Sequence, residues 1–293
     1  MGWSSTRAIA MMALPLVCIA ATAPARALDQ AEAQELLAMI AAGVKPQTVQ
    51  LNDAAIQDYR HPQGEDGAHE FLVISRGDHS PIKLAAQHFT MKTLQVGGQG
   101  PNAIYVSYSG GDHCCYTVHL IWIVRELRYE SIDLGASDLS IVGGHGAMRL
   151  RFQDPAFASW HRSEPGPGPT VQLKYDPETR HYVADADAMR KPPPDAAAFE
   201  QQAAAIRKTY AALPPGALDP SLWTAMLDLI YSGNADTARS LLDEAWPPDR
   251  PGEGDFLTDF SRQLWQGAIW RRFELGAALG AEAAFPPLDR GRK

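Results

Sequence analysis

Between Phe71 and Asp185 the chain is a succession of short apolar or alternating runs, separated by Gly, Pro, Asp and Ser. The runs are FLVIS, AIYVSYS, YTVHLIWIV, LRYESID, AMRLRF, AFASWH, TVQLKY and RHYVAD. Runs of this length between turn formers are typical of meandering antiparallel sheets. The pattern therefore predicts an all-β unit, which we place at residues 69–190.

One segment of this unit occurs twice. Val96-Gly-Gly-Gln-Gly-Pro-Asn-Ala-Ile104 returns as Val142-Gly-Gly-His-Gly-Ala-Met-Arg-Leu150, 46 residues later. Each copy is a glycine-rich turn that leads into an alternating run, and the spacing is about that of one propeller-like blade of three or four strands. The repeat predicts two related β-meanders that pack as a sandwich or as a propeller-like roll.

Helix signals surround this unit. The segment DQAEAQELLAMIAA begins at Asp29 and ends before Gly43, which favours a short leading helix within a region of helix and connector at 28–68. Three prolines in the segment 191–195 predict a stiff linker and a domain boundary. Beyond it, apolar residues at helical spacing predict a small helical bundle at 196–293. The expected fold class is therefore α+β, an antiparallel β-meander unit followed by helices.

Four helices are expected in this C-terminal part. Asp195 caps the first, Asp219-Pro220 begins the second, ADTARSLLDEAW forms the third, and one continuous fourth helix carries Leu257, Phe260, Leu264, Ala268 and Leu275. The tryptophans in this region are expected in the core rather than in a ligand cage.

The first 27 residues have the pattern of a secretory signal peptide. Arg7 precedes an apolar run that is too short for a stable membrane helix, and Ala25 and Ala27 form an A-x-A cleavage pattern. No other run is long enough to span a bilayer, so the chain is expected in the periplasm or outside the cell. Loss of Arg7 and Arg26 leaves 24 basic against 34 acidic residues, which argues against nucleic acid as a partner.

The most unusual local feature is a pair of adjacent cysteines. Ser109, Gly110, Gly111, Asp112 and His113 form a candidate functional turn immediately before Cys114 and Cys115. Once the signal peptide is removed, these two cysteines are the only ones, so they either bridge each other, bridge two chains or stay reduced. Adjacent Cα atoms lie about 3.8 Å apart, which strains a mutual bridge, but the two glycines ease the turn. We favour a vicinal disulfide that holds the turn rigid, without a redox role.

Metal binding and familiar catalytic motifs are not expected. With Cys115 to Val124 as a strand, Tyr116, Val118, Leu120 and Trp122 form the core face, and Cys115, Thr117 and His119 the opposite face. Cys115 and His119 are then about 13 Å apart, too far to share an ion. The chain also lacks a Cys-x-x-Cys pair, a Gly-x-Ser-x-Gly elbow, a Walker loop and a His-Glu-x-x-His pair. No metal or other cofactor is therefore predicted.

The segment from Leu94 to Asp185 resembles a group of uncharacterised exported bacterial proteins with a Gly-Gly-Ala-His-Cys-Cys motif. Residues 109–115 match that motif except that Asp112 stands in place of alanine. The turn before the motif in those proteins resembles the calcium-binding turns of FG-GAP/integrin-like repeats. Here the two glycine-rich turns have no carboxylate, so calcium binding is not expected. The resemblance implies a fold and a compartment, and no activity.

Two functions follow as expectations. The first is an exported, non-catalytic binding or interaction protein, whose partner is an unknown envelope protein or glycan. The alternative is a cell-envelope hydrolase acting on an envelope polymer, with Asp112 or His113 beside Cys114 and Cys115 as acid or base. The first is favoured because no recognised catalytic constellation is present in the sequence.

Overall fold

The computed structural model describes residues 28–51, 53–61, 68–77, 81–94, 100–108, 115–123, 127–143, 148–162, 166–214 and 216–287. These residues form an α+β structure with three four-stranded antiparallel sheets and several helices, most of them C-terminal. The predicted signal peptide at 1–27 lies outside the described residues. None of the helices described is both long and apolar enough to cross a membrane.

Each sheet is a simple meander in which neighbouring strands follow one another along the chain. The first sheet contains β1 (Gln47–Leu51), β2 (Ala54–Tyr59), β3 (Glu70–Arg76) and β4 (Ile82–Ala86). The second contains β5 (His88–Leu94), β6 (Ala103–Tyr108), β7 (Tyr116–Trp122) and β8 (Arg128–Gly135). The third contains β9 (Ser140–Val142), β10 (Arg149–Gln153), β11 (Thr170–Asp176) and β12 (His181–Ala184).

The repeated glycine-rich segments occupy equivalent places in two of these sheets. The first copy connects β5 to β6, and the second connects β9 to β10, so each follows the first strand of its sheet. The structure contains three meanders rather than the two predicted from the repeat. The additional meander was missed because its first two strands are joined by a short connection at 52–53, which carries no glycine-rich signal.

Several strand assignments differ from those expected. β1 and β2 lie within 28–68, where helix and connector were predicted, and β4 and β5 were also missed. β1 and β5 are outer strands of their sheets, and each buries only one side chain, so neither needs a strong apolar alternation. The run AFASWH is not a strand. Asp154 caps a 3-10 helix, η1 (Pro155–Phe157), and its side chain accepts a hydrogen bond from the backbone N–H of Ala156.

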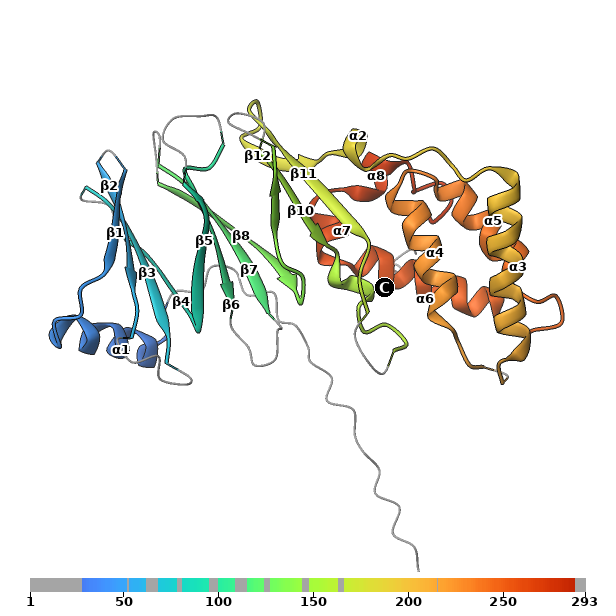
Figure 1. The fold of residues 1–293 in the computed structure, drawn as a ribbon, viewed down its shortest axis with the longest axis horizontal. Helices are drawn as coiled ribbons and strands as arrows, with labels where there is room; N and C mark the ends of the chain where they lie inside the picture. The colour runs from blue at the N-terminus through green and yellow to red at the C-terminus, as the bar shows by residue number, and fades with distance from the viewer. Residues whose placement is uncertain are drawn as a thin grey trace, which may run out of the picture.

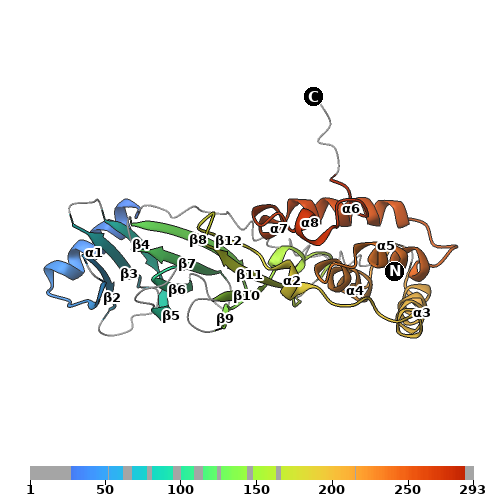
Figure 2. The same cartoon turned by 90° about the horizontal axis from the view of Figure 1, so that it is seen from above.

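The sheets stack face to face, with helices at both ends of the stack (Figures 1 and 2). Helix α1 (Gln30–Ala41) packs Leu36 and Met39 against Phe71 and Val73 on the outer face of the first sheet. The opposite face of the first sheet packs against the second sheet, in a cluster that includes Ile74, Phe89 and Ile121. Both faces of the first sheet and one face of the second are therefore covered.

The third sheet and the C-terminal helices share one hydrophobic cluster with the second sheet. The helices are α2 (Ala186–Met189), α3 (Ala196–Ala212), α4 (Pro220–Tyr231), α5 (Ala235–Ala245), α6 (Glu253–Gln266), α7 (Ala268–Arg272) and α8 (Leu275–Leu279). The cluster continues across the proline-rich segment 191–195, from Met189 to Ala203. Lys191 is also tied to the α4–α5 turn, because its N–H donates to the carbonyl oxygen of Ser232 at 3.1 Å. Buried residues on both sides of the proline-rich segment thus belong to one hydrophobic cluster.

The predicted helix ends are largely confirmed. Asp195 and Asp219 cap α3 and α4 with their side chains, and Gly43 follows α1 with a φ of +78°. The expected fourth helix is instead three pieces, α6, α7 and α8, which separate first at Gly267. Gly267 leaves the helical conformation with a ψ of 127°. A Cβ there would lie 3.1 Å from the carbonyl oxygen of Leu264 and 3.3 Å from the Cβ of Ala156, so the break lies where the chain packs closely on η1.

A buried hydrogen bond joins the C-terminal helices to the third sheet. The hydroxyl of Tyr231 in α4 donates to Oδ2 of Asp154 at 2.7 Å, and Oδ1 of Asp154 accepts from the N–H of Ala156 at 2.9 Å. Both side chains are fully buried, and burial raises the pKa of Asp154 and of Tyr231 above their ordinary values. A buried carboxyl group is costly unless its oxygens are paired, so Tyr231 is expected to matter for stability.

We predict that Tyr231→Phe lowers the free energy of unfolding by about 1–3 kcal/mol, because Asp154 loses a buried donor. Tyr182→Phe is the matched control, since Tyr182 is 4% exposed and its buried hydroxyl has no hydrogen-bond partner among the described residues. Removing that hydroxyl is expected to leave stability unchanged or slightly higher. Denaturant unfolding of both variants measures the difference, and equal losses in the two would contradict the role of Asp154.

Candidate functional site

The predicted functional turn connects two paired strands of the second sheet. Residues 109–114 lie outside the described residues, so the positions of Asp112, His113 and Cys114 are not part of the structure. On either side of them, Tyr108 ends β6 and Tyr116 begins β7, and these two residues pair directly across the strands. Their rings lie 5.4 Å apart between centroids and are tilted by 49°. The motif therefore spans a hairpin whose base is a tyrosine pair.

Cys115 is the one motif residue that the structure describes. It is exposed and has a φ of +74°, which places a non-glycine residue in the left-handed region. That conformation costs an L-residue on the order of 1–2 kcal/mol. The backbone is therefore unusual where the cysteine pair meets β7.

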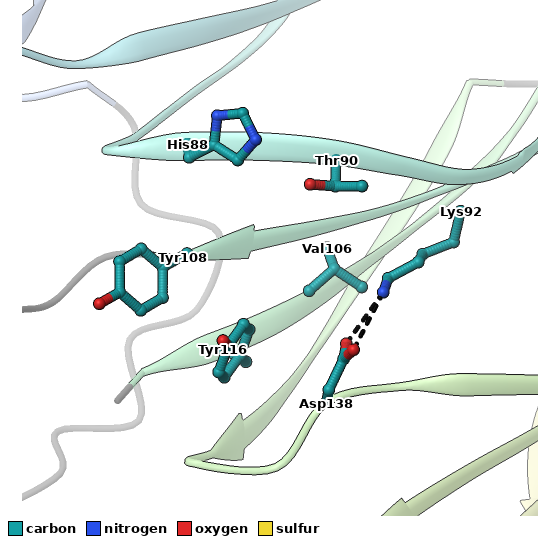
Figure 3. Close-up of a pocket in the computed structure, with 7 residues that line it drawn as sticks. All are labelled: His88, Thr90, Lys92, Val106, Tyr108, Tyr116 and Asp138. Carbon is teal, nitrogen blue, oxygen red and sulfur yellow. Dashed lines mark hydrogen bonds and ion pairs between the residues drawn. The ribbon is translucent and has the colours of Figure 1, made fainter. Parts of the chain in front are cut away.

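A groove of about 380 Å³ lies beside this hairpin, on the face of the second sheet that carries Tyr108 and Tyr116 (Figure 3). Three adjacent strands and the segment after β8 contribute its lining. The lining residues are His88, Thr90 and Lys92 from β5, Val106 and Tyr108 from β6, Tyr116 from β7, and Asp138. On β5 they alternate with Phe89, which points into the cluster against the first sheet.

An ion pair forms one end of the groove. The Nζ atom of Lys92 lies 3.0 Å from Oδ1 of Asp138 and 3.2 Å from Oδ2. The N–H of Leu139 donates to Oδ1 of Asp138 at 2.7 Å, which fixes the carboxylate in the connection between the second and third sheets. The Asp138 side chain is 62% exposed, so the pair adds little stability. Its charged atoms are available to a ligand.

His88 is oriented by a carboxylate from the first sheet. Its Nδ1 lies 3.0 Å from Oε1 of Glu70, and the N–H of Phe89 donates to Oε2 of Glu70 at 2.7 Å. An ionised carboxylate only accepts, so this contact places the proton on Nδ1 of His88. Nε2 is then an acceptor, and it has no hydrogen-bond partner among the described residues. A half-exposed imidazole held in this way is able to accept a hydrogen bond or a proton at the groove.

A second histidine lies on the opposite face of the same sheet. Nε2 of His119 lies 2.7 Å from Oγ of Ser107, and Nδ1 lies 2.7 Å from the hydroxyl of Tyr129. The sequence places this face away from the core, but His119 is 6% exposed because the first sheet covers it. Burial lowers the pKa of His119 to about 3. His119 is therefore a neutral, fully paired residue and not a base for a groove ligand.

This pairing predicts how stability depends on pH. The pKa of a histidine is about 6.5 in the unfolded chain and about 3 at His119 in the folded one. Between these values only the unfolded state binds the proton, so the free energy of unfolding falls as the pH decreases from 6.5 towards 3. The contribution is about 1.4 kcal/mol per pH unit.

Comparison with His119→Gln isolates this contribution, because other groups titrate equally in both proteins. Denaturant unfolding from pH 7 to pH 4 is expected to show a steeper loss in the wild type. Parallel stability curves would contradict a neutral His119.

A larger pocket of about 780 Å³ lies where β8, β12 and α7 meet. Glu130 is its central charge, and three cationic or titratable side chains surround it. Nδ1 of His181 lies 2.8 Å from Oε1 of Glu130, Arg272 approaches Oε2 at 3.6 Å, and Arg128 also pairs with Glu130. Burial lowers the pKa of Arg272. Two arginines and a histidine thus converge on one carboxylate, and this cluster joins the sheets to the helices.

Sequence reasoning identified the hairpin and missed the groove beside it. The missed residues His88, Thr90 and Lys92 come from β5, which was not predicted as a strand. Their alternation with Phe89 is consistent with a strand, but one apolar residue in a polar run is weak evidence for one. Asp138 carries no local signal, because it reaches the groove only through the packing of successive sheets.

Among the described residues, no three His, Cys, Asp or Glu side chains are grouped so as to hold a metal ion. The glycine-rich turns at 96–99 and 144–147 lie outside that set, so the expectation about calcium stays a prediction. Comparison of the chain with protein-family models, curated proteins and solved structures gave no match. The resemblance at residues 109–115 likewise stays a prediction.

Proposed function

We propose that this chain is an exported, non-catalytic binding protein of the periplasm or cell exterior, and that its ligand occupies the groove beside residues 109–115. The observation that carries this proposal is the position of the Tyr108–Tyr116 pair. It lies at the base of the motif hairpin and also lines the groove. Aromatic side chains beside a few fixed polar groups are the usual composition of a binding site.

The stacked sheets suit such a role. Each four-stranded meander has the topology of a propeller blade, and we propose that the three form an open, propeller-like stack. Helices cover the exposed faces at both ends, as terminal caps do in repeat proteins. This leaves the connections between strands as the surface that is free to bind a ligand.

The alternative is an envelope hydrolase, and one observation favours it. His88 is oriented by Glu70 and has Nε2 directed away from that contact, which is the arrangement of a base with its orienting carboxylate. The motif residues Asp112 and His113 follow Tyr108 in sequence, and Tyr108 pairs with His88 across β5 and β6. A reaction would therefore occur in the same groove.

One experiment tests binding and separates the two functions. Envelope polymers and proteins are passed over the immobilised mature chain, over Tyr116→Ala and over Tyr116→Phe. We expect retention by the wild type and by Tyr116→Phe, loss with Tyr116→Ala, and recovery of the ligand with unchanged mass. Equal retention by all three proteins would reject the groove as the site.

Recovery of shortened polymer would instead favour the hydrolase, provided that His88→Gln or His113→Ala abolishes the shortening. Circular dichroism and thermal melting of each variant establish that its fold is retained.

The cysteine pair is assigned a structural role beside this site. Cys114 and Cys115 form a vicinal disulfide that keeps the hairpin in one conformation. An exported protein reaches an oxidising compartment, which favours disulfide formation. The left-handed backbone at Cys115 is consistent with the unusual geometry that a bond between adjacent cysteines needs. A rigid hairpin lowers the entropy that the ligand-binding surface loses on association.

This role predicts the mass of the exported protein. Denatured without reductant, it should be a monomer two hydrogens lighter than its reduced form and should not react with an alkylating agent. Reduction should restore two reactive thiols. Two alkylated cysteines before reduction, or a dimer that reductant separates, would contradict the vicinal bond.

A further inference from the structure

We infer that the groove beside the motif hairpin binds a neutral saccharide. This inference rests on the proposed function, which places a ligand in the groove, and it names the chemical class of that ligand. Three features of the lining support it: a tilted tyrosine pair at one end, an ion pair at the other, and the imidazole of His88, which Glu70 of the first sheet orients. Figure 3 shows the tyrosines and the ion pair on opposite sides of Val106.

The tyrosine pair provides an apolar surface with polar edges. Tyr108 and Tyr116 are both partly exposed, and their hydroxyl groups are at the ends of the side chains. The face of an aromatic ring is electron-rich, and it attracts the weakly positive C–H groups on one face of a sugar ring. A sugar can stack on such a surface while its hydroxyl groups stay hydrated. An alkyl ligand would gain less, because Val106 is the only purely aliphatic side chain among the described residues that line the groove.

The ion pair selects against charged ligands. Lys92 and Asp138 neutralise each other, so neither an anion nor a cation gains a net attraction at this end of the groove. The chain as a whole is acidic, with a formal net charge of −8, which also disfavours anions. A pair of neighbouring hydroxyl groups suits the site, because one accepts from the ammonium group and the other donates to the carboxylate.

The remaining polar groups are complementary to hydroxyl groups as well. Thr90 contributes a hydroxyl that donates and accepts, and Nε2 of His88 accepts. Glu70 fixes the imidazole of His88, and the N–H of Leu139 fixes Asp138, so these groups are oriented before a ligand arrives. The described residues of the groove thus present one stacking surface and several fixed donors and acceptors, and the charges of Lys92 and Asp138 cancel.

The test uses defined oligosaccharides and isothermal titration calorimetry on the mature chain. The neutral probes are gluco-oligosaccharides and N-acetylglucosamine oligomers, and the charged probes are uronic acid oligomers and deacetylated glucosamine oligomers. We expect a neutral probe to bind more tightly than either charged one. Tyr116→Ala should weaken that binding at least tenfold, whereas Tyr116→Phe should stay within threefold of the wild type.

Asp138→Asn provides an independent test of the charge argument. It leaves the ammonium group of Lys92 without its carboxylate, so the preference should shift at least tenfold towards the uronic acid oligomers. Asp187→Asn is the matched control, because Asp187 is exposed, lies in α2 and is 83% accessible. An unchanged preference in Asp138→Asn would overturn the role of the ion pair.

Failure of this inference and failure of the proposed function have different results. If no saccharide binds, but envelope material is retained in a Tyr116-dependent way, the saccharide is wrong and the binding groove stands. If a saccharide binds equally well to Tyr116→Ala, the groove is not its site, and the inference is overturned. If neither saccharides nor envelope material are retained, both proposals fail.

Discussion

The structure depends on the burial of both faces of its central sheets. The second sheet packs its two faces into separate hydrophobic clusters, one shared with the first sheet and one with the third sheet and the helices. Face-to-face burial provides most of the apolar contact in such a stack, because each meander alone would expose one apolar face. The first and third sheets each have one further apolar face, which α1 and the C-terminal helices cover, respectively.

Covering both faces has a consequence for the polar residues on the strands. Ser107 and His119 lie between the first and second sheets, where an unpaired polar group is costly. Ser107 hydrogen-bonds one imidazole nitrogen of His119, and the hydroxyl of Tyr129 hydrogen-bonds the other, so the histidine stays neutral. Asp154 and Tyr231 likewise pair through a buried hydrogen bond where α4 meets the end of the third sheet. The polar side chains that are available to bind a ligand therefore lie at the edges and hairpins of the stack.

The groove is a product of this stacking. Glu70 of the first sheet orients His88, and Asp138, on the way to the third sheet, pairs with Lys92. Only the tyrosine pair comes from a single hairpin. Neighbouring sheets thus hold the side chains of the candidate site from both sides, which explains how an exposed groove keeps fixed polar groups. The same dependence explains why a local motif alone did not reveal the site.

Local patterns in the sequence were enough to predict the α+β class, antiparallel meanders, the caps at Asp195 and Asp219, and the turn around the cysteine pair. These features depend on local signals such as turn residues, capping side chains and alternation of apolar residues. Tertiary structure alone decided the third meander, the burial of His119, the break at Gly267 and the meeting of His88, Lys92 and Asp138. Each of these depends on which face of a strand or helix meets another element. Local alternation shows that two faces of a strand differ, but a face becomes buried only when a partner from elsewhere in the chain packs on it.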